Sequence, residues 1–365
     1  MNRDGMMRNA GIVRDTGMVR DSSTMRDAGT FRAQRRRLLK SASLALLGAS
    51  GLTSADTARG TERAFSFAFI GDVPYSTLDI DRTRSVLAAI DPACLFVIHV
   101  GDLKASSDAC TNALLEERFD LLRDSALPLV FVPGDNDWSD CLKPDSGVTR
   151  PFERLDYIRK RLFNEPRSIG QKTLTFEQQS ATHPANPLSG NPVPENVRWI
   201  THGVLFVTLN RPGGVDLRKF TNSESQMLSD LYQANERWLR ASFALAQQRG
   251  IKLVSIAAHA NPFFENDLRS WRNRSKRDPH AKFRRLLGDL SRNFDGQVLF
   301  MHGDTHWFQT NQPLIDRYGD EIPNFTRIEC FGTPFSSSWV QVRVTPDSAP
   351  MFTVSTYHLD ASRRP

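Results

Sequence analysis

The fold is decided by the stretch FSFAFIGD, residues 65–72. Its apolar and aromatic part is short and is bounded by turn residues, which predicts a mostly buried β-strand. Gly71 then allows the chain to turn sharply, so that Asp72 places a carboxylate at the C-terminal end of this strand. The same arrangement recurs along the chain, and this stretch therefore serves as the template for the other segments.

Further short apolar runs predict strands in the rest of the chain. They lie at residues 95–100, 129–132, 204–209, 253–258, 298–301, 327–331 and 340–344. Helix-like segments lie at residues 81–90, 113–125, 224–248 and 279–294. Because strands and helices alternate, the sequence predicts an α/β sandwich with a substantially parallel sheet.

Polar clusters follow five of the predicted strands. They are centred on Asp72, Asp102, residues 134–137, His259 and residues 302–306. Since the C-terminal ends of parallel strands are where ligands bind, we expect these side chains to gather at one rim. Clustered aspartates repel one another. A pair of divalent ions neutralises this repulsion and also binds a phosphate between the two ions.

The order and spacing of these clusters resemble those of the calcineurin-like metallophosphoesterases, whose motifs run D-x-H, GD, GNH(E/D), H and GHxH. The resemblance covers roughly residues 64–358. It implies a four-layer α/β/β/α sandwich with two mixed sheets. It also implies hydrolysis of phosphate mono- or diesters at a dinuclear metal site, with a small phosphorylated molecule as substrate.

The resemblance implies a role for each matching residue. The expected metal ligands are Asp72, Asp102, Asp135, His259, Asp304 and His306. Asp102 is expected to lie between the two ions, and His302 to lie just behind the ligands. Asn136 and Asp137 are the expected catalytic residues: Asn136 orients the phosphate, and Asp137 is one candidate for the missing general acid.

The chain departs from the family pattern at Pro74, Asp135, Asn136 and Asp304, which stand in place of histidine, asparagine, histidine and histidine. Tyr75 is the nearest substitute for the ligand lost at Pro74. The family's ions include Mn, Mg, Ca, Fe and Zn, and the oxygen-rich ligand set favours Mn, Mg or Ca. Lys104 and Arg211 are candidate cations for holding a phosphate.

Two functions remain open from the sequence. The first is a hydrolase of phosphate esters, which the retained Asp72, Asp102, His259 and His306 favour. The alternative is a catalytically degenerate fold that acts as a metal- or partner-binding module, which Asn136 and Pro74 favour. A G-x-S-x-G elbow and a P-loop pattern are both missing, so serine-hydrolase and P-loop chemistry are excluded. The remaining histidines are expected to be structural or on the surface: His99, His183, His202, His280 and His358.

The first 55 residues have the layout of an export leader. The segment RRRLLK at 35–40 precedes a short, mildly apolar stretch and then small residues ending at Ala55, which resembles a twin-arginine signal. We therefore expect recognition by export machinery and a periplasmic or secreted protein, with a single domain at residues 60–360. No run is long enough to predict a membrane span.

Net charge gives no support for nucleic-acid binding. The chain carries a formal charge of +6, but residues 1–55 hold ten Lys and Arg against four Asp and Glu, which leaves the remainder neutral.

All four cysteines follow the leader, and Cys110 and Cys141 lie downstream of two ligand-bearing loops on strands expected to be neighbours. We predict a disulfide between them. Residues 170–194 are expected to form a long surface loop or lid.

Overall fold

The computed structural model describes residues 64–142, 150–180, 192–215, 217–263, 278–316 and 318–359. These residues belong to one compact unit, Ala58–Pro365. The expected leader, residues 1–55, and His183 lie outside the described residues. Among the helices that are described, none combines the length and the apolar character that a membrane crossing requires.

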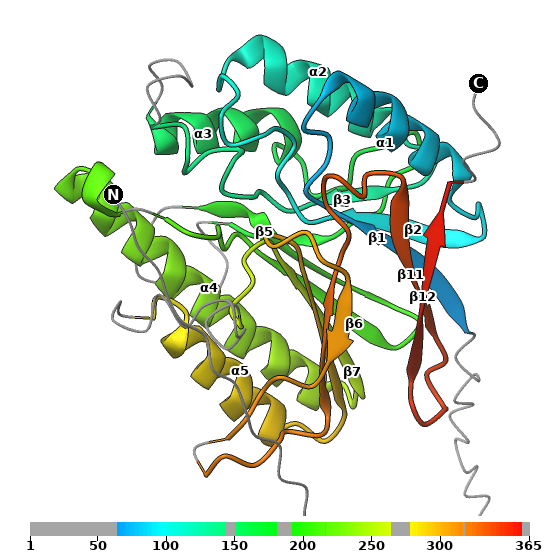
Figure 1. Cartoon of the computed structure of the whole chain (residues 1–365). Helices are drawn as coiled ribbons and strands as arrows, with labels where there is room; N and C mark the ends of the chain where they lie inside the picture. The colour runs from blue at the N-terminus through cyan, green and yellow to red at the C-terminus, as the bar shows by residue number, and fades with distance from the viewer. Residues whose placement is uncertain are drawn as a thin grey trace, which may run out of the picture. The chain divides into compact units, whose positions relative to one another are not determined.

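One sheet has five strands and begins with the template segment (Figure 1). Its strands are β1 Phe65–Ile70, β2 Cys94–His99, β3 Leu129–Phe131, β11 Ser338–Val344 and β12 Phe352–His358. The order across the sheet is β12-β11-β1-β2-β3. The pairs β1–β2 and β2–β3 are parallel, whereas β11 pairs antiparallel with both of its neighbours. The sheet is therefore mixed.

The other sheet has seven strands in the order β4-β5-β6-β7-β8-β10-β9. They are β4 Glu177–Gln179, β5 Val193–Thr201, β6 Val204–Leu209, β7 Leu253–Ala258, β8 Gln297–His302, β9 Gln309–Asn311 and β10 Phe325–Glu329. The four inner strands β6, β7, β8 and β10 run parallel, and the outer strands pair antiparallel. This sheet is also mixed, with a parallel centre that matches the sequence prediction.

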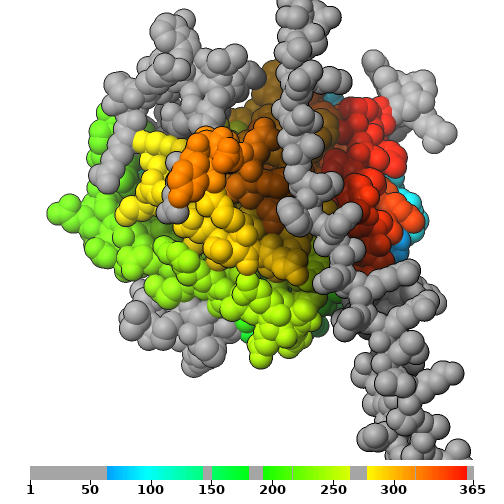
Figure 2. Space-filling view, turned by 90° about the horizontal axis from the view of Figure 1, so that it is seen from below, coloured from blue at the N-terminus to red at the C-terminus, as the bar shows by residue number. Residues whose placement is uncertain are grey.

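Helices cover the outer faces of both sheets. They are α1 Thr77–Ala89, α2 Asn112–Arg123, α3 Pro151–Leu162, α4 Asn222–Gln248 and α5 Ala281–Arg292, with a 3₁₀ turn η2 at Leu217–Lys219. The hydroxyls of Ser76, Thr111 and Thr221 accept from the first turns of α1, α2 and α4 and so fix where these helices begin. Figure 2 looks onto the face that α4 and α5 form.

Three hydrophobic clusters fill the spaces between the layers. In β1, Phe67 and Phe69 point into the cluster between the sheets, while Ala68 and Ile70 point towards the cluster beneath α1, α2 and α3. The third cluster joins the seven-stranded sheet to α4 and α5. Side chains alternate in this way because successive residues of a strand face opposite sides. The predicted four-layer α/β/β/α sandwich with two mixed sheets is confirmed.

Several elements were not expected from the sequence. Helix α3 and strand β12 were missed, and β4 lies inside the segment that was expected to be a loop or lid, of which residues 181–191 are outside the described residues. Strand β5 was also missed, because Glu195 and Asn196 are polar yet fully buried. Arg159 and the Asn210 amide bond the Glu195 carboxylate, and Asn196 bonds Gln179 and Asn235. A buried polar strand of this kind has no apolar signature.

Candidate metal centre

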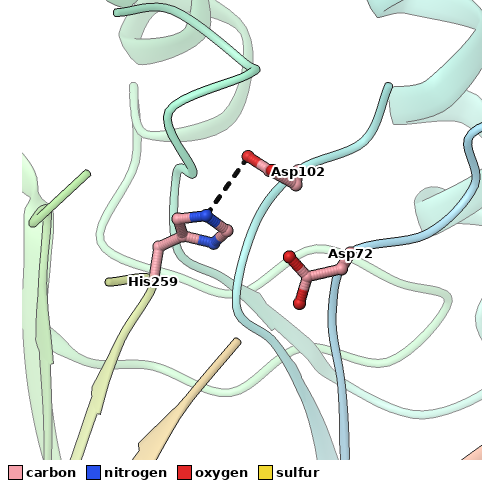
Figure 3. A group of neighbouring side chains, drawn as sticks. All are labelled: Asp72, Asp102 and His259. Atoms are coloured by element: carbon pink, nitrogen blue, oxygen red, sulfur yellow. Dashed lines mark ion pairs between the residues drawn. The ribbon is translucent and has the colours of Figure 1, made fainter. Parts of the chain in front are cut away.

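The expected ligands lie at the C-terminal ends of five strands. Asp72 follows β1, Asp102 follows β2 and Asp135 follows β3, all in the five-stranded sheet. His259 follows β7, and Asp304 and His306 follow β8 in the seven-stranded sheet. The two sheets thus meet at a single rim, and Figure 3 shows Asp72, Asp102 and His259 converging there from separate strands.

One half of the centre consists of Asp135, His259 and Asp304, whose ligand atoms lie within 4.8 Å of one another. His259 Nε2 is 2.8 Å from Asp135 Oδ1 and 4.0 Å from Asp304 Oδ1. The other ring nitrogen, Nδ1, lies 2.7 Å from the Val100 carbonyl and donates to it. A neutral His259 therefore presents only a lone pair at Nε2, which is the orientation that metal-binding histidines adopt.

The other half consists of Asp72, Asp102, His306 and Tyr75. His306 Nδ1 donates to the Thr333 carbonyl at 2.7 Å, so Nε2 faces Asp72 Oδ1 at 3.6 Å. The Tyr75 hydroxyl donates to Asp102 Oδ2 at 2.8 Å and lies 3.3 Å from His306 Nε2. Tyr75 thus reaches the position where its oxygen can replace the histidine that Pro74 removes.

Asp102 connects the two halves. Its Oδ1 atom is 3.4 Å from His259 Nε2, and this ion pair is the dashed line in Figure 3. Its Oδ2 atom accepts from Tyr75 and, at 2.6 Å, from the Asn136 side-chain amide. Gly134 is required beside it, because a Cβ at that position would collide with the Asp102 carboxylate. The expected position of Asp102 between two ions is compatible with these contacts.

Asp137 differs from the other aspartates of the rim. Its carboxylate accepts from the backbone N–H groups of Asp102, Leu103 and Gly134 at 2.7–2.9 Å, and it is fully buried. Two loops that carry ligands are therefore tied to a single side chain. A carboxylate that accepts three such bonds is held as an anchor and is poorly placed to deliver a proton.

The ligand loops adopt an unusual backbone conformation. Asp72, Asp102, Asp304 and His306 have φ values of 55°, 62°, 77° and 66°. This left-handed region is sparsely populated by residues other than glycine and costs about 1–3 kcal/mol each. Among the described residues, His202 in the β5–β6 turn has the one other positive φ outside glycine. Strain is thus concentrated where the ligands lie.

Burial governs the protonation of this centre. Desolvation raises the pKa of Asp72, Asp102 and Asp137 above the usual range and that of Asp304 to about 7. For Asp135 burial acts in the same direction, but the adjacent His259 lowers its pKa. Burial would lower the pKa of His259, yet Asp102 and Asp135 raise it. These buried side chains together therefore stabilise a positive charge among them, and they disfavour the simultaneous ionisation of all the carboxyl groups.

The donor set fits a divalent cation. Asp135 Oδ1 and His259 Nε2 are buried and lie 2.8 Å apart, and among the described residues neither atom has a partner other than the one it faces. Two acceptors that face each other at this distance require a cation or a proton between them. The neighbouring carboxylates of Asp102 and Asp304 add oxygen ligands, which suits Mn, Mg or Ca.

The two expected phosphate-holding cations have other partners. Lys104 is buried, and its ammonium donates to the carbonyls of Ala105 and Asp108. Arg211 is also buried, its guanidinium lies 4.5 Å from the ring centroids of Tyr232 and Phe283, and it donates to the Pro279 carbonyl. None of these hydrogen bonds involves an expected ligand, although the Lys104 charge also acts on Asp137 and Asp102.

Some residues that support the centre had no motif to reveal them. The expected structural histidine His99 contacts the Val73 carbonyl through Nε2 and accepts from the Gly101 N–H at Nδ1, so it joins the Asp72 and Asp102 loops. The Asn261 N–H donates to Asp304 Oδ2 at 3.1 Å. His302 is buried and contacts the Gly303 carbonyl and Arg327.

The predicted disulfide between Cys110 and Cys141 is confirmed. Cys110 follows the Asp102 loop, and Cys141 follows the loop that holds Asp135 and Asn136. The Cys141 sulfur also lies 3.7 Å from the Asp137 carbonyl. Cys94 and Cys330 are free and buried. The bridge thus joins the two loops that Asp137 already anchors.

A search of family models gives no match to this chain, and a comparison with curated proteins gives none either. Solved structures of similar fold include a purple acid phosphatase from yellow lupin (Lupinus luteus) seeds, with 11% identity and a TM-score of 0.44. The match covers 82% of this chain but only 55% of the lupin protein. The protein TT1561 of Thermus thermophilus has 10% identity and a TM-score of 0.42, with 81% of this chain and 99% of that chain covered.

A third similar structure is GAP50, the anchor in the inner membrane complex of Plasmodium, with 10% identity, a TM-score of 0.42, and coverage of 81% of this chain and 89% of that chain. Likenesses of this size carry no conclusion about activity. The sheet order itself shows two mixed sheets flanked by helices, which is the architecture that the resemblance to the calcineurin-like metallophosphoesterases implied.

Proposed function

We propose that the chain is an exported, divalent-metal-dependent hydrolase of phosphate mono- or diesters. One observation carries the proposal: His259 Nε2 and Asp135 Oδ1 are buried and face each other at 2.8 Å, next to Asp102 and Asp304. Such a group is stable only with positive charge among its atoms, which a divalent cation would supply.

The proposed ligands divide between two ions. Asp135, His259 and Asp304 would hold one, and Asp72, His306 and Tyr75 the other, with Asp102 shared. Bound there, a pair of divalent ions supplies Lewis-acid activation of the phosphoryl group and of water. The oxygen-rich set leads us to propose Mn, Mg or Ca.

Asn136 orients the substrate in this proposal. Its side-chain amide donates one hydrogen to Asp102 and the other to the Tyr75 hydroxyl, and the second hydrogen can be redirected from Tyr75 to a phosphoryl oxygen. An amide delivers no proton to a departing alkoxide. We assign Asp137 to anchoring the loops, since its carboxylate accepts three backbone bonds. Esters whose leaving groups are stable anions are therefore the proposed substrates.

The test is metal analysis of the purified mature protein, together with hydrolysis of an aryl phosphate monoester and an aryl diester. We expect two bound ions per chain and hydrolysis that a chelator abolishes and Mn, Mg or Ca restores. Zinc serves as the comparison metal. Protein that binds no metal and hydrolyses neither ester with any of these ions would overturn the proposal.

A non-catalytic metal- or partner-binding module is the second candidate. The observation that favours it is Asn136, which replaces the proton-donating histidine and is engaged by Asp102 and Tyr75. The same experiment separates the two candidates. Stoichiometric metal without hydrolysis of either aryl ester would support the binding module.

Export is proposed from the arginine-rich leader and from the disulfide, which is stable in oxidising compartments. Replacing Arg35 and Arg36 together by Lys should leave unprocessed protein in the cytoplasm, whereas the wild-type chain is cleaved near Ala55. Replacing Arg32 and Arg37 by Lys gives a control of equal charge. Normal processing of the Arg35/Arg36 variant would contradict the twin-arginine proposal.

A further inference from the structure

Two exposed aromatic side chains lie beside the candidate metal centre. Trp307 directly follows His306, and Phe335 is two residues beyond Thr333, whose carbonyl orients the His306 ring. The rings of Trp307 and Phe335 have centroids 5.1 Å apart at an interplanar angle of 61°. Trp307 is 53% exposed and Phe335 is 37% exposed. Large apolar surface is thus presented to solvent at the edge of the centre.

The pair rests on a fixed base. Phe331 contacts Phe335 and stacks on Phe308, and both Phe308 and Phe331 pack against the hydrophobic cluster between the sheets. The Trp307 backbone N–H donates to the buried Glu329 carboxylate at 3.2 Å. These contacts hold the two side chains in place without burying them. A surface that is ordered in advance loses little conformational entropy when a ligand binds.

The two segments that carry the pair are also the segments that hold His306. The Gly332 N–H donates to the His306 carbonyl, and a Cβ on Gly332 would lie 2.8 Å from His306 Cγ. Because consecutive Cα atoms are only about 3.8 Å apart, Trp307 cannot be far from the ligand that precedes it. The two segments that carry the aromatic pair are therefore the ones that position His306.

Exposed apolar side chains are ordinary on protein surfaces. Tyr318 is 72% exposed and lies in the turn of Asp316, which pairs with Arg292 at the last turn of α5. Trp307 and Phe335 are distinguished by their place on the two segments that hold the expected ligand His306. Paired aromatic rings at a polar site are suited to stacking against a planar group of a ligand.

We propose that Trp307 and Phe335 bind the aromatic ring of an aryl phosphate ester, whose phosphoryl group lies at the metal centre. This inference rests on the proposed phosphoesterase function and names its substrate class. It agrees independently with Asn136, since phenolate-type leaving groups depart without a proton from the enzyme. One edge of the site thus recognises the leaving group, and the ligands recognise the phosphoryl group.

Binding of two phosphonates to the metal-loaded protein tests the inference directly. By titration calorimetry, phenylphosphonate should bind about tenfold more tightly than methylphosphonate. Trp307→Ala and Phe335→Ala should each remove most of this difference, whereas Trp307→Phe should retain most of it. Tyr318→Ala is the matched control and should leave both affinities unchanged. Thermal unfolding and metal content are measured for each variant to show that fold and centre are intact.

Kinetics provides a second measurement. Trp307→Ala should raise KM for 4-nitrophenyl phosphate about tenfold with little change in kcat. It should leave KM for acetyl phosphate unchanged, because acetate is a stable leaving anion without a ring. Equal affinity of the wild type for the two phosphonates, or an equal loss of both in Trp307→Ala, would overturn the inference. If the metal-loaded wild type binds neither phosphonate and hydrolyses neither ester, the proposed function itself fails.

Discussion

The two halves of the metal centre satisfy their polar atoms in different ways. In the half formed by Asp135, His259 and Asp304, two buried acceptors face each other at 2.8 Å. In the half formed by Asp72, Asp102 and His306, the protein's own donors are already in place, namely the Tyr75 hydroxyl and the Asp304 N–H. The first half therefore needs a cation or a proton between its two acceptors, whereas the second half is already satisfied by the protein's own donors.

This difference predicts unequal affinity for two ions. A cation entering the first half removes a buried repulsion, whereas a cation entering the second half must displace the Tyr75 proton from Asp102. We expect the first ion to bind more tightly and to remain after mild chelation. Substitutions at the shared Asp102, in the first half and in the second half should therefore reduce metal binding and activity by different amounts.

The largest effect is expected for Asp102→Ala, because Asp102 belongs to both halves. Hydrolysis of an aryl phosphate should fall to the level of chelator-treated protein, and metal analysis should find fewer than one ion per chain. Asn136→Ala provides the neighbouring control, since it removes an amide and no ligand, and its loss should be smaller. Activity of Asp102→Ala equal to that of the wild type would contradict both the division of the centre into two halves and the assignment of Asp102 as a shared ligand.

A large effect on stability is expected for Asp137→Ala. Three buried backbone N–H groups would lose their acceptor, and each unsatisfied group costs about 1–3 kcal/mol, so the free energy of unfolding should drop by about 3 kcal/mol or more. Asp137→Asn keeps one acceptor oxygen and should lose less. Urea unfolding measures both. If Asp137→Ala is as stable as the wild type but inactive, Asp137 acts in chemistry and is no mere anchor.

An intermediate effect is expected for Tyr75→Phe. The second half would lose the hydroxyl that contacts Asp102 and His306, which should weaken the second ion about tenfold while the first ion is unaffected. Titration with Mn²⁺ followed by magnetic resonance distinguishes the two affinities. Equal weakening of both ions would show that the halves are not independent.

The smallest effect is a change in pH dependence at His99. Burial lowers the pKa of His99 to about 4 in the folded chain, against an ordinary value of 6.5. The unfolded chain therefore binds more protons in this window, so stability should fall as pH decreases from about 6.5 to about 4. His99→Gln does not titrate and should flatten this part of the stability profile. An unchanged profile in the variant would assign the acid sensitivity to other groups.

The sequence was sufficient for much of the fold because the inner strands are apolar. Runs such as residues 204–209 and 253–258 are buried on both faces, so each reads as a nearly unbroken apolar segment in the sequence. Strand β5 escaped detection since Glu195 and Asn196 are buried with partners from distant segments. A polar residue with a distant partner is indistinguishable in sequence from one in solvent.

The places of the expected ligands in the fold were also predictable, because each follows a strand end. The functions of neighbouring residues were not. Asp135 and Asp137 are two residues apart in one loop, yet one carboxylate faces His259 and the other accepts backbone bonds from the Asp102 loop. Which carboxylate faces His259 and which accepts backbone bonds depends on how this loop packs against the Asp102 loop, and the sequence does not show that packing. Likewise, the sequence does not predict that Trp307 is exposed, because its exposure depends on the segments of Glu329 and Phe335 that pack beside it.

The left-handed backbone at Asp72, Asp102, Asp304 and His306 has a consequence for laboratory evolution. Glycine adopts this conformation without strain, so at these positions it should be preferred over alanine in any library screened for folding alone. A screen for metal-dependent hydrolysis of the same library should restore aspartate and histidine. Positions that reverse their preference between the two screens would then mark the centre without any structural information.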